Sequence, residues 1–311
     1  MKPKLLASSF EIKFFTILGA FLVGMILVSF FISHQIIRNN ISKPSKIVVN
    51  PYENLNLTAK SIFVFDVRAN KVLFSKNPDE RLPLASITKV MTALVAKSME
   101  SKKDTVTISQ EAIRAEGDSG FKVGEKWSLE NLLDFLLTSS SNDGATAVAL
   151  AFGAKKDFIN LMNKKADELG MLNTYYFNET GVDLPAQSGE SVPKGGAYGT
   201  ARDTATLFAF ILKNYPSLLS ATTKAESDIS SLNKINHVAR NTDLIAENIP
   251  GIKGSKTGFT DLAGGNLVIA FDPELGRPII ISVLGSTAEA RFTDVEKLVE
   301  ATLINIQNTK N

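Results

Sequence analysis

The feature that most constrains the fold is a pair of strand patterns at opposite ends of one stretch of chain. Residues 61–67 alternate, turn at residues 68–70 and return through residues 71–75, which is the pattern of a β-hairpin. Residues 264–271 and 277–285 form a second hairpin pattern. Helical patterns lie between the hairpins, near residues 86–97, 129–138, 145–150, 156–169 and 200–213. We expect a mixed α/β domain of the α+β type, whose antiparallel sheet comes from both ends, flanked by helices and a mostly helical subdomain.

An apolar segment over residues 14–33 precedes this domain. It has about twenty residues without a charge, enough to cross the hydrocarbon core of a bilayer as a helix. The alternative is a cleavable signal peptide, which has a shorter apolar region that ends in a small-residue site. No such site follows residue 33. We therefore predict an uncleaved transmembrane signal-anchor.

Basic residues flank the apolar segment on both sides, so charge alone does not orient it. The following segment is polar, contains Pro44 and Pro51, and has no helical period, which is typical of a linker. The expected organisation is an N-terminus over 1–13, the anchor over 14–33, a linker over 34–58 and one folded domain over 59–311.

Ser86 and Lys89 form a Ser-x-x-Lys motif at the start of a predicted helix. Pro83 precedes a long run with helical periodicity, so Ser86 falls in the first turn. Residues three apart share a helix face, and free N–H groups at a helix start favour an oxygen that becomes an anion. The alternative is a helix cap beside a solvated lysine. Ser191 and Ser231 begin the same pattern without such a helix, so the motif alone does not identify a site.

Two further motifs accompany the first. Ser140 and Asn142 lie in a polar cluster between two helical runs, where buried polar groups must be hydrogen-bonded or functional. Lys256, Thr257 and Gly258 precede a strand-like run, among glycines that let a strand approach a ligand closely. Alone, the Lys-Thr-Gly sequence is also compatible with an ordinary turn. Together the three motifs indicate serine acyl transfer that needs no histidine.

The composition argues against several other classes of site. The chain has no cysteine and two histidines, His34 and His237, neither of which has a second ligand at zinc spacing. We expect His237 to be an ordinary surface or loop residue. The formal net charge is +2 without a basic block, and no nucleotide-binding fingerprint appears. Neither nucleic acid, a metal nor a cofactor is expected.

The three motifs, in this order, resemble those of the penicillin-binding protein and serine β-lactamase superfamily, and most closely the low-molecular-mass D-alanyl-D-alanine carboxypeptidases. The similarity runs from about Ser61 to about Leu298 and implies a β-lactamase/transpeptidase-like catalytic domain. The implied ligands are peptidoglycan stem peptides and β-lactams. Because peptidoglycan lies outside the membrane, the resemblance also implies a cytoplasmic N-terminus and a single-pass bacterial membrane protein with an extracytoplasmic catalytic domain.

The resemblance implies roles for individual catalytic residues. Ser86 would be the nucleophile that forms the acyl-enzyme, and Lys89 the base that takes its proton. Ser140 would relay protons to the leaving amine. The backbone N–H groups of Ser86 and Phe259 would form the oxyanion hole.

The resemblance also implies a set of substrate-binding residues. Asn142 would hold the substrate amide and the lysine, and Arg291 would bind the terminal carboxylate. Lys256 and Thr257 would bind substrate as well. The complete expected set is Ser86, Lys89 and Ser140 for catalysis, with Asn142, Lys256, Thr257, Phe259 and Arg291 for binding.

Lys89 can act as a base only if its pKa falls. A free lysine has a pKa of about 10.4. To act as a base near neutral pH, its pKa must fall by roughly three units, which corresponds to about 4 kcal/mol. A helix terminus contributes only about 0.3–1 kcal/mol. A second cation a few ångströms away contributes about 4 kcal/mol at an effective dielectric of about 20. We hypothesise that Lys256 and burial together hold Lys89 neutral.

Other functions remain open at this point. A D,D-endopeptidase would use the same site on cross-linked peptides. A β-lactamase would need a glutamate that activates water, and Glu168 and Glu179 are the nearest candidates. A non-catalytic cell-wall-binding protein is the third alternative, although its motifs would be expected to decay. The chain departs from the family pattern at Ser141, where glycine is common, and at Glu179, where proline is usual.

Overall fold

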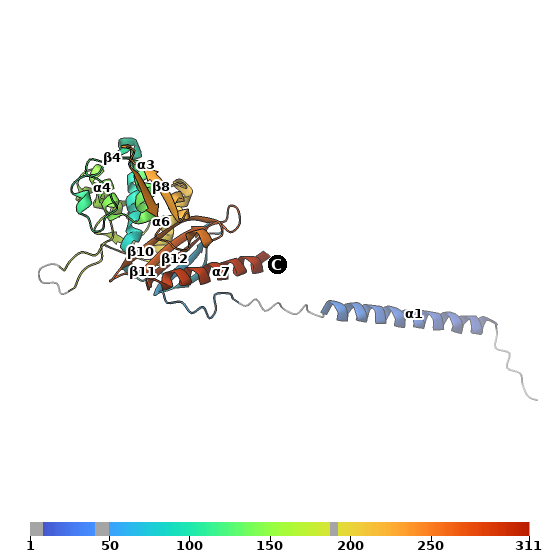
Figure 1. Cartoon of the computed structure of the whole chain (residues 1–311). Helices are drawn as coiled ribbons and strands as arrows, with labels where there is room; N and C mark the ends of the chain where they lie inside the picture. The colour runs from blue at the N-terminus through green and yellow to red at the C-terminus, as the bar shows by residue number, and fades with distance from the viewer. Residues whose placement is uncertain (1–8, 41–49, 187–191, 311) are drawn as a thin grey trace, which may run out of the picture. The chain divides into compact units, whose positions relative to one another are not determined.

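The computed structural model describes residues 9–40, 50–186 and 192–310 and divides into two units, Met1–Val49 and Asn50–Asn311 (Figure 1). The first unit contains one described helix, α1 (Ser9–Asn40). Its apolar part, Lys13–Ile36, is 24 residues long, and every residue in it is exposed.

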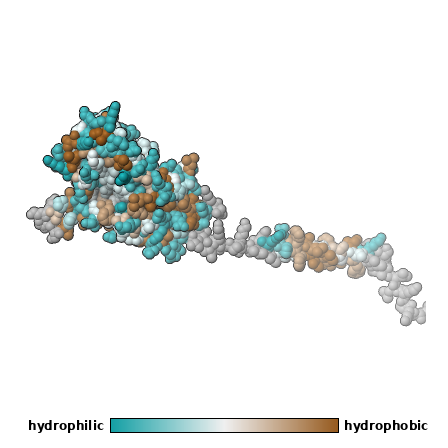
Figure 2. All heavy atoms as spheres, in the orientation of Figure 1, coloured by the Kyte–Doolittle hydropathy of each residue, from teal (hydrophilic) through white to brown (hydrophobic). Residues whose placement is uncertain are grey.

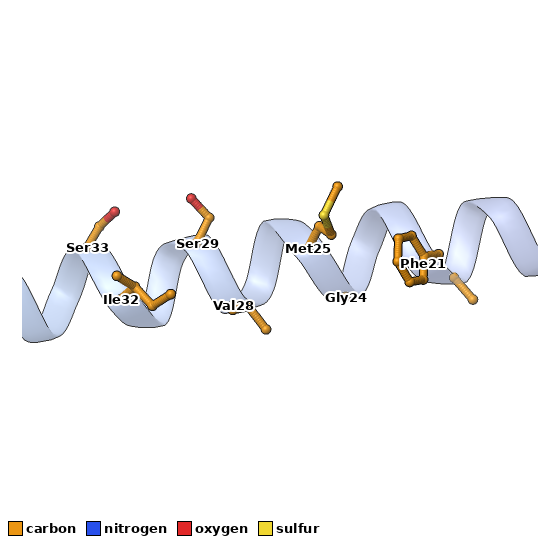
Figure 3. A pocket seen from close by; sticks show the side chains of 8 residues that line it. Phe21, Gly24, Met25, Val28, Ser29, Ile32 and Ser33 are labelled. Carbon is orange, nitrogen blue, oxygen red and sulfur yellow. The ribbon is translucent and has the colours of Figure 1, made fainter.

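Exposed apolar side chains occupy most of the middle of α1. Figure 2 shows hydrophobic residues along the middle of the helix and hydrophilic residues towards each end. In close-up, Met25, Ser29 and Ser33 project from one side at the four-residue spacing of a helix face (Figure 3). A helix of this length and composition fits a bilayer core, and a signal sequence would have the same properties.

The predicted linker over residues 34–58 is wrong at both ends. Helix α1 continues to Asn40, because no proline or glycine after Ser33 interrupts its backbone hydrogen bonds. At the other end Tyr52 is 5% exposed, and the Thr58 N–H donates to Asp294 Oδ1 at 3.0 Å. Those residues belong to the folded unit, while residues 41–49 lie outside the described part of the chain.

The sheet of the folded unit joins the two ends of its sequence, as predicted. Its antiparallel strands have the order β10-β11-β12-β1-β2, and the register of β1 against β12 runs from Ser61 opposite Leu284 to Asp66 opposite Ile279. The strands are β1 (Ser61–Asp66), β2 (Lys71–Lys76), β10 (Ile252–Thr260), β11 (Gly264–Phe271) and β12 (Ile279–Ser286). This confirms the α+β class and both predicted hairpins.

Alternating side chains give the sheet two buried faces. Ile62 and Val64 lie in one hydrophobic cluster together with residues of helix α7 (Ala290–Lys310), whereas Phe63, between them, lies in the other cluster. Helix α6 (Ala201–Asn214) packs against β12 and β1. The two-residue period of the strands therefore places α7 on one face and the helical subdomain on the other.

Helix α2 (Thr88–Ser98) lies at the centre of the helical subdomain. Every residue from Thr88 to Ala96 is buried, which is the pattern of a helix surrounded on all sides by protein. It packs against its three neighbours α3 (Leu129–Ser139), α4 (Asn142–Ala151) and α5 (Lys155–Glu168). All five predicted helices are confirmed, to within a few residues at their ends.

Short elements complete the unit, and most lack a clear sequence pattern. Three small sheets contain β3 (Leu82–Pro83), β7 (Ala197–Gly199) and β6 (Tyr175–Tyr176); β4 (Thr105–Thr107) and β5 (Lys126–Ser128); and β8 (Glu226–Ser230) and β9 (Asn236–Arg240). The single-turn helices are η1 (Ala85–Ile87), η2 (Glu100–Lys102), η3 (Ala112–Arg114), η4 (Ser220–Thr223) and η5 (Ala246–Asn248).

The expectation for His237 is wrong. It lies on β9 with its side chain 9% exposed, and its Nε2 lies 2.8 Å from Glu125 Oε1. Its ring contacts Phe121, Trp127 and Phe135. The hydrogen bond to the buried carboxylate of Glu125 satisfies a polar atom of the ring, so His237 can pack within this aromatic cluster.

Candidate active site

Ser86 lies in η1, immediately before α2, in a turn that other elements hold in place. Ala85 has a φ of +48°, an uncommon value for a residue with a side chain. The side-chain amide of Asn266, from β11, donates to Pro83 O at 3.0 Å and to Leu84 O at 3.1 Å. The Ser86 side chain remains partly exposed. Asn266 is not among the residues that the sequence motifs predict, although a polar residue in a central strand is a signal for such a role.

Lys89 reaches Ser86 from the first turn of α2. Its Nζ lies 2.7 Å from Ser86 Oγ and donates to the backbone oxygen of Thr180 at 2.8 Å. The residue is 0% exposed. The three-residue spacing therefore places the amine beside the hydroxyl, as predicted, and the solvated-lysine alternative is wrong.

Ser140 is presented by the break between two helices. It ends α3 with a φ of +61°, and Ser141 then caps α4 by accepting from the Gly144 N–H at 2.8 Å. The Lys256 ammonium donates to Ser140 Oγ at 2.9 Å. The polar cluster is thus satisfied by capping and by a lysine from the sheet.

The Lys-Thr-Gly motif lies on β10, the strand at the edge of the sheet that packs against η1. Lys256 and Thr257 are 1% and 3% exposed. A Cβ on Gly258 would lie 2.8 Å from Leu84 O and 3.2 Å from Ser86 N. Only glycine lets the strand approach the turn at Ser86 so closely, which is why this position has no side chain.

Both active-site lysines have lowered pKa values, and burial is the largest cause for each. Burial lowers the pKa of Lys89 to about 7, against the opposing charges of Glu179, Asp143 and Glu116. Burial, and then the positive charge of Lys89, lowers the pKa of Lys256 well below its usual range. Because repulsion between two charges is mutual, each ammonium favours loss of the proton from the other. Of the two causes hypothesised for the lowered pKa of Lys89, Lys256 and burial, burial contributes most.

Asn142 lies on the first turn of α4 with one free acceptor. Its Nδ2 donates to Glu116 O at 2.7 Å, while Oδ1 is buried and has no hydrogen-bond partner among the described residues. The expected contact of Asn142 with the lysine is not among these hydrogen bonds. A buried acceptor without a partner is costly, which fits a group that awaits a donor from a ligand.

Arg291 and Phe259 both lie next to Gly258, Arg291 through a hydrogen bond and Phe259 as the following residue of β10. Arg291 is in the first turn of α7, and its NH1 donates to Gly258 O at 2.9 Å. Its Nε has no hydrogen-bond partner among the described residues. Phe259 is 50% exposed. It borders a cavity of about 630 Å³ with Leu262, Val182, Leu184, Pro185 and Pro193.

Four further residues are candidates from the sequence: Ser191, Ser231, Glu168 and Glu179. Ser191 lies within residues 187–191, which are outside the described part of the chain. Ser231 lies in the turn between β8 and β9. Glu168 is exposed and hydrogen-bonded to Lys165, and Glu179 is buried beside α4.

Comparisons with known proteins agree with this fold. The family model for D-alanyl-D-alanine carboxypeptidase matches residues 47–288. The chain is 31% identical to D-alanyl-D-alanine carboxypeptidase DacF of Bacillus subtilis, covering 78% of this chain and 61% of that protein. It is 36% identical to a D-alanyl-D-alanine endopeptidase of Pseudomonas aeruginosa, covering 68% of this chain and 67% of the relative.

A solved structure gives the same result. The chain superposes on penicillin-binding protein D2 of Listeria monocytogenes, in its ampicillin-bound form, with a TM-score of 0.66. The two chains are 29% identical over 80% of this chain and 98% of that one. The resemblance drawn from the three motifs is therefore confirmed. The protein belongs to the D-alanyl-D-alanine carboxypeptidase family of peptidases.

Proposed function

We propose that the protein is a membrane-anchored serine-type D-alanyl-D-alanine carboxypeptidase that acts on peptidoglycan stem peptides through an acyl-enzyme on Ser86. The observation that carries this proposal is the 2.7 Å distance between Lys89 Nζ and Ser86 Oγ, at a lysine whose pKa burial lowers to about 7. A neutral amine at that distance can accept the serine proton near neutral pH.

The proposed reaction begins when neutral Lys89 takes the proton of Ser86 and Oγ attacks the carbonyl of the penultimate D-alanine. The backbone N–H groups of Ser86 and Phe259 would stabilise the oxyanion. As the C–N bond breaks, Ser140, which is hydrogen-bonded to Lys256, passes its hydroxyl proton to the amine of the leaving D-alanine and takes up in its place the proton that Lys89 accepted from Ser86, so that Lys89 becomes neutral again. Water then attacks the acyl ester with Lys89 again as the base, which releases the shortened peptide and restores Ser86.

The proposed binding roles rest on groups that lack partners or face the nucleophile. Asn142 Oδ1 is a free acceptor for a substrate N–H, and Arg291 Nε is a free donor for the terminal carboxylate. Thr257 lies on the same strand as Gly258, which backs onto the Ser86 turn. An extended peptide along the edge of β10 would meet all of these groups.

The membrane part of the proposal rests on the apolar helix Lys13–Ile36 and on the substrate. The helix is long enough to cross a bilayer, and peptidoglycan lies on the outer side. We therefore propose an N-terminus inside the cell and a catalytic domain outside. An alkaline phosphatase fusion after Lys46 should be active. After extraction with alkaline carbonate, the membrane fraction should still contain the uncleaved chain.

Mass spectrometry of the purified protein tests the enzymatic proposal. Incubation with penicillin should give an adduct on Ser86, and incubation with a pentapeptide stem should release free D-alanine. The Ser86→Ala variant, which keeps the fold and removes only the hydroxyl, should give neither product. Absence of both products from the unaltered protein would leave only a binding role.

A D,D-endopeptidase is the second candidate, because the endopeptidase of Pseudomonas aeruginosa shares 36% identity with this chain. The chain spans only 61% of the length of the carboxypeptidase relative from Bacillus subtilis, so the two activities need separate assays. Purified cross-linked muropeptide distinguishes them: an endopeptidase splits it into monomers, whereas a strict carboxypeptidase leaves the cross-link intact. Rapid turnover of a chromogenic cephalosporin would instead indicate a β-lactamase.

A further inference from the structure

A buried carboxylate, Glu179, lies beside the proposed base and has no part in the reaction described above. It belongs to the loop that follows β6 and is 4% exposed. A carboxylate taken out of water is costly unless hydrogen bonds and opposite charges compensate it. Its surroundings supply both kinds of compensation.

The backbone of the loop is bonded to the helix that carries the base. Lys89 Nζ donates to Thr180 O at 2.8 Å, and Thr92 Oγ1 donates to Glu179 O at 2.7 Å. Lys89 and Thr92 are three residues apart and therefore share a face of α2. Two consecutive carbonyl groups of the loop thus fix the direction in which Lys89 extends towards Ser86.

The side chain of Glu179 is bonded to the two neighbouring helices. Thr146 Oγ1, on α4, donates to Glu179 Oε1 at 2.7 Å. Lys155 Nζ, at the start of α5, lies 3.9 Å from the same oxygen and 3.5 Å from Glu111 Oε1. The side chain of Lys155 is 40% exposed, so it neutralises the buried carboxylate only in part.

Charged groups from several elements act on the amine of Lys89. Among the carboxylates that oppose the effect of burial on the pKa of Lys89, Glu179 is the strongest. The charged groups facing Lys89 and Glu179 are Asp143 on α4, Glu116 in the loop after η3, Lys256 on β10, and Lys155 on α5 with its partner Glu111.

We propose that Glu179 is a positioning residue for Lys89: its loop directs the amine onto Ser86, and its buried carboxylate sets the pH above which the amine can take the serine proton. This inference rests on the proposed function of Ser86 and Lys89. The loop after β6 would then help to set the pH range in which the enzyme is acylated.

The test is the pH profile of acylation, measured on the full chain. The second-order rate constant for labelling by a fluorescent penicillin is followed from about pH 5 to about pH 10, across the range in which a shifted lysine titrates. The Glu179→Gln variant keeps an oxygen for Thr146 and removes the charge. Its acidic limb should move to lower pH by roughly half a unit to one unit, because the ammonium form of Lys89 loses a stabilising charge.

The Lys155→Met variant should shift the profile in the opposite direction. Without its partner, Glu179 favours the ammonium form of Lys89 more strongly, so the acidic limb should move to higher pH. The Glu168→Gln variant is the matched control, because Glu168 is an exposed carboxylate bonded to Lys165. Its profile should equal that of the unaltered protein.

The outcomes separate this inference from the proposed function. If the unaltered protein acylates but the Glu179→Gln and Lys155→Met profiles both coincide with it, or both move the same way, the inference is overturned. If the unaltered protein does not acylate at all, the proposed function fails first. Should the Glu179→Gln variant not fold, as judged by its thermal midpoint, the Lys155→Met variant alone tests the inference. A shift of its acidic limb to higher pH supports the inference, and no shift or a shift to lower pH overturns it.

Discussion

Lys256 Nζ donates to Ser140 Oγ at 2.9 Å, although 116 positions separate the two residues along the chain. The contact joins an edge strand of the sheet to the break between α3 and α4 in the helical subdomain. The nucleophile turn lies against the same strand at Gly258. The proposed proton relay therefore lies at the interface between the sheet and the helical subdomain, and the distance between Lys256 and Ser140 depends on how these two parts pack together.

Removal of the second cation should change the pH dependence of acylation. In a Lys256→Met variant the ammonium form of Lys89 loses a repulsive neighbour, so its pKa should rise and the acidic limb should move to higher pH. The shift should be less than about one unit, because burial is the larger cause and stays in place. Labelling by fluorescent penicillin across pH measures it, and an unmoved limb would show that Lys256 does not act on Lys89.

The turn at Gly181 should tolerate no side chain. Its φ is +80°, and a Cβ there would lie 1.9 Å from Ala85 O, next to the nucleophile. Gly124 has a φ of +82° with nothing within 4 Å of a Cβ, so it is a matched control for backbone strain alone. Chemical denaturation should give a loss of about 1 kcal/mol for Gly124→Ala and about 3 kcal/mol or more for Gly181→Ala. Equal losses would contradict the close packing of this loop on η1.

The role proposed for Arg291 predicts a selective loss. An Arg291→Gln variant should lower kcat/KM on a peptide with a free C-terminal carboxylate by about tenfold to a hundredfold, the effect of losing a charged hydrogen bond. An amidated peptide should be affected far less. Because Arg291 also bonds Gly258 O, an equal fall on both peptides would mean that the residue supports β10 rather than binding the carboxylate.

Asp134, on α3, should make stability depend on pH. Burial, with the nearby charge of Glu130, raises the pKa of Asp134 to about 6. The folded state therefore holds this proton more tightly than the unfolded state, so the contribution to stability is complete below about pH 4 and is lost as pH rises to about 6. At pH 8, the free energy of unfolding of the Asp134→Asn variant should exceed that of the unaltered protein by about 1–2 kcal/mol, allowing for partial exposure. At about pH 4 the two proteins should be equally stable. Thermal unfolding at both values measures this.

The local sequence determined the elements and the residues that carry the chemistry. Periods of two and 3.6 predicted the hairpins of β1–β2 and β11–β12 and the five helices, because those periods follow from the local geometry of the backbone. The three-residue spacing placed Lys89 beside Ser86 for the same reason. His237 and the linker went wrong where burial decides, since neither a buried ring nor the packing of Tyr52 leaves a local pattern.

Only the tertiary structure decided how the lysines are charged and what holds the nucleophile turn. Asn266 bonds that turn, and the backbone oxygens of Thr180 and Glu179 bond helix α2, which carries Lys89. No spacing in the sequence connects these three residues with Ser86 or Lys89. The lowered pKa of Lys89 follows mainly from burial, which a residue's neighbours in sequence do not reveal. Local pattern fixes which groups are present, whereas desolvation and long-range contacts arise only when the sheet and the helices close around them.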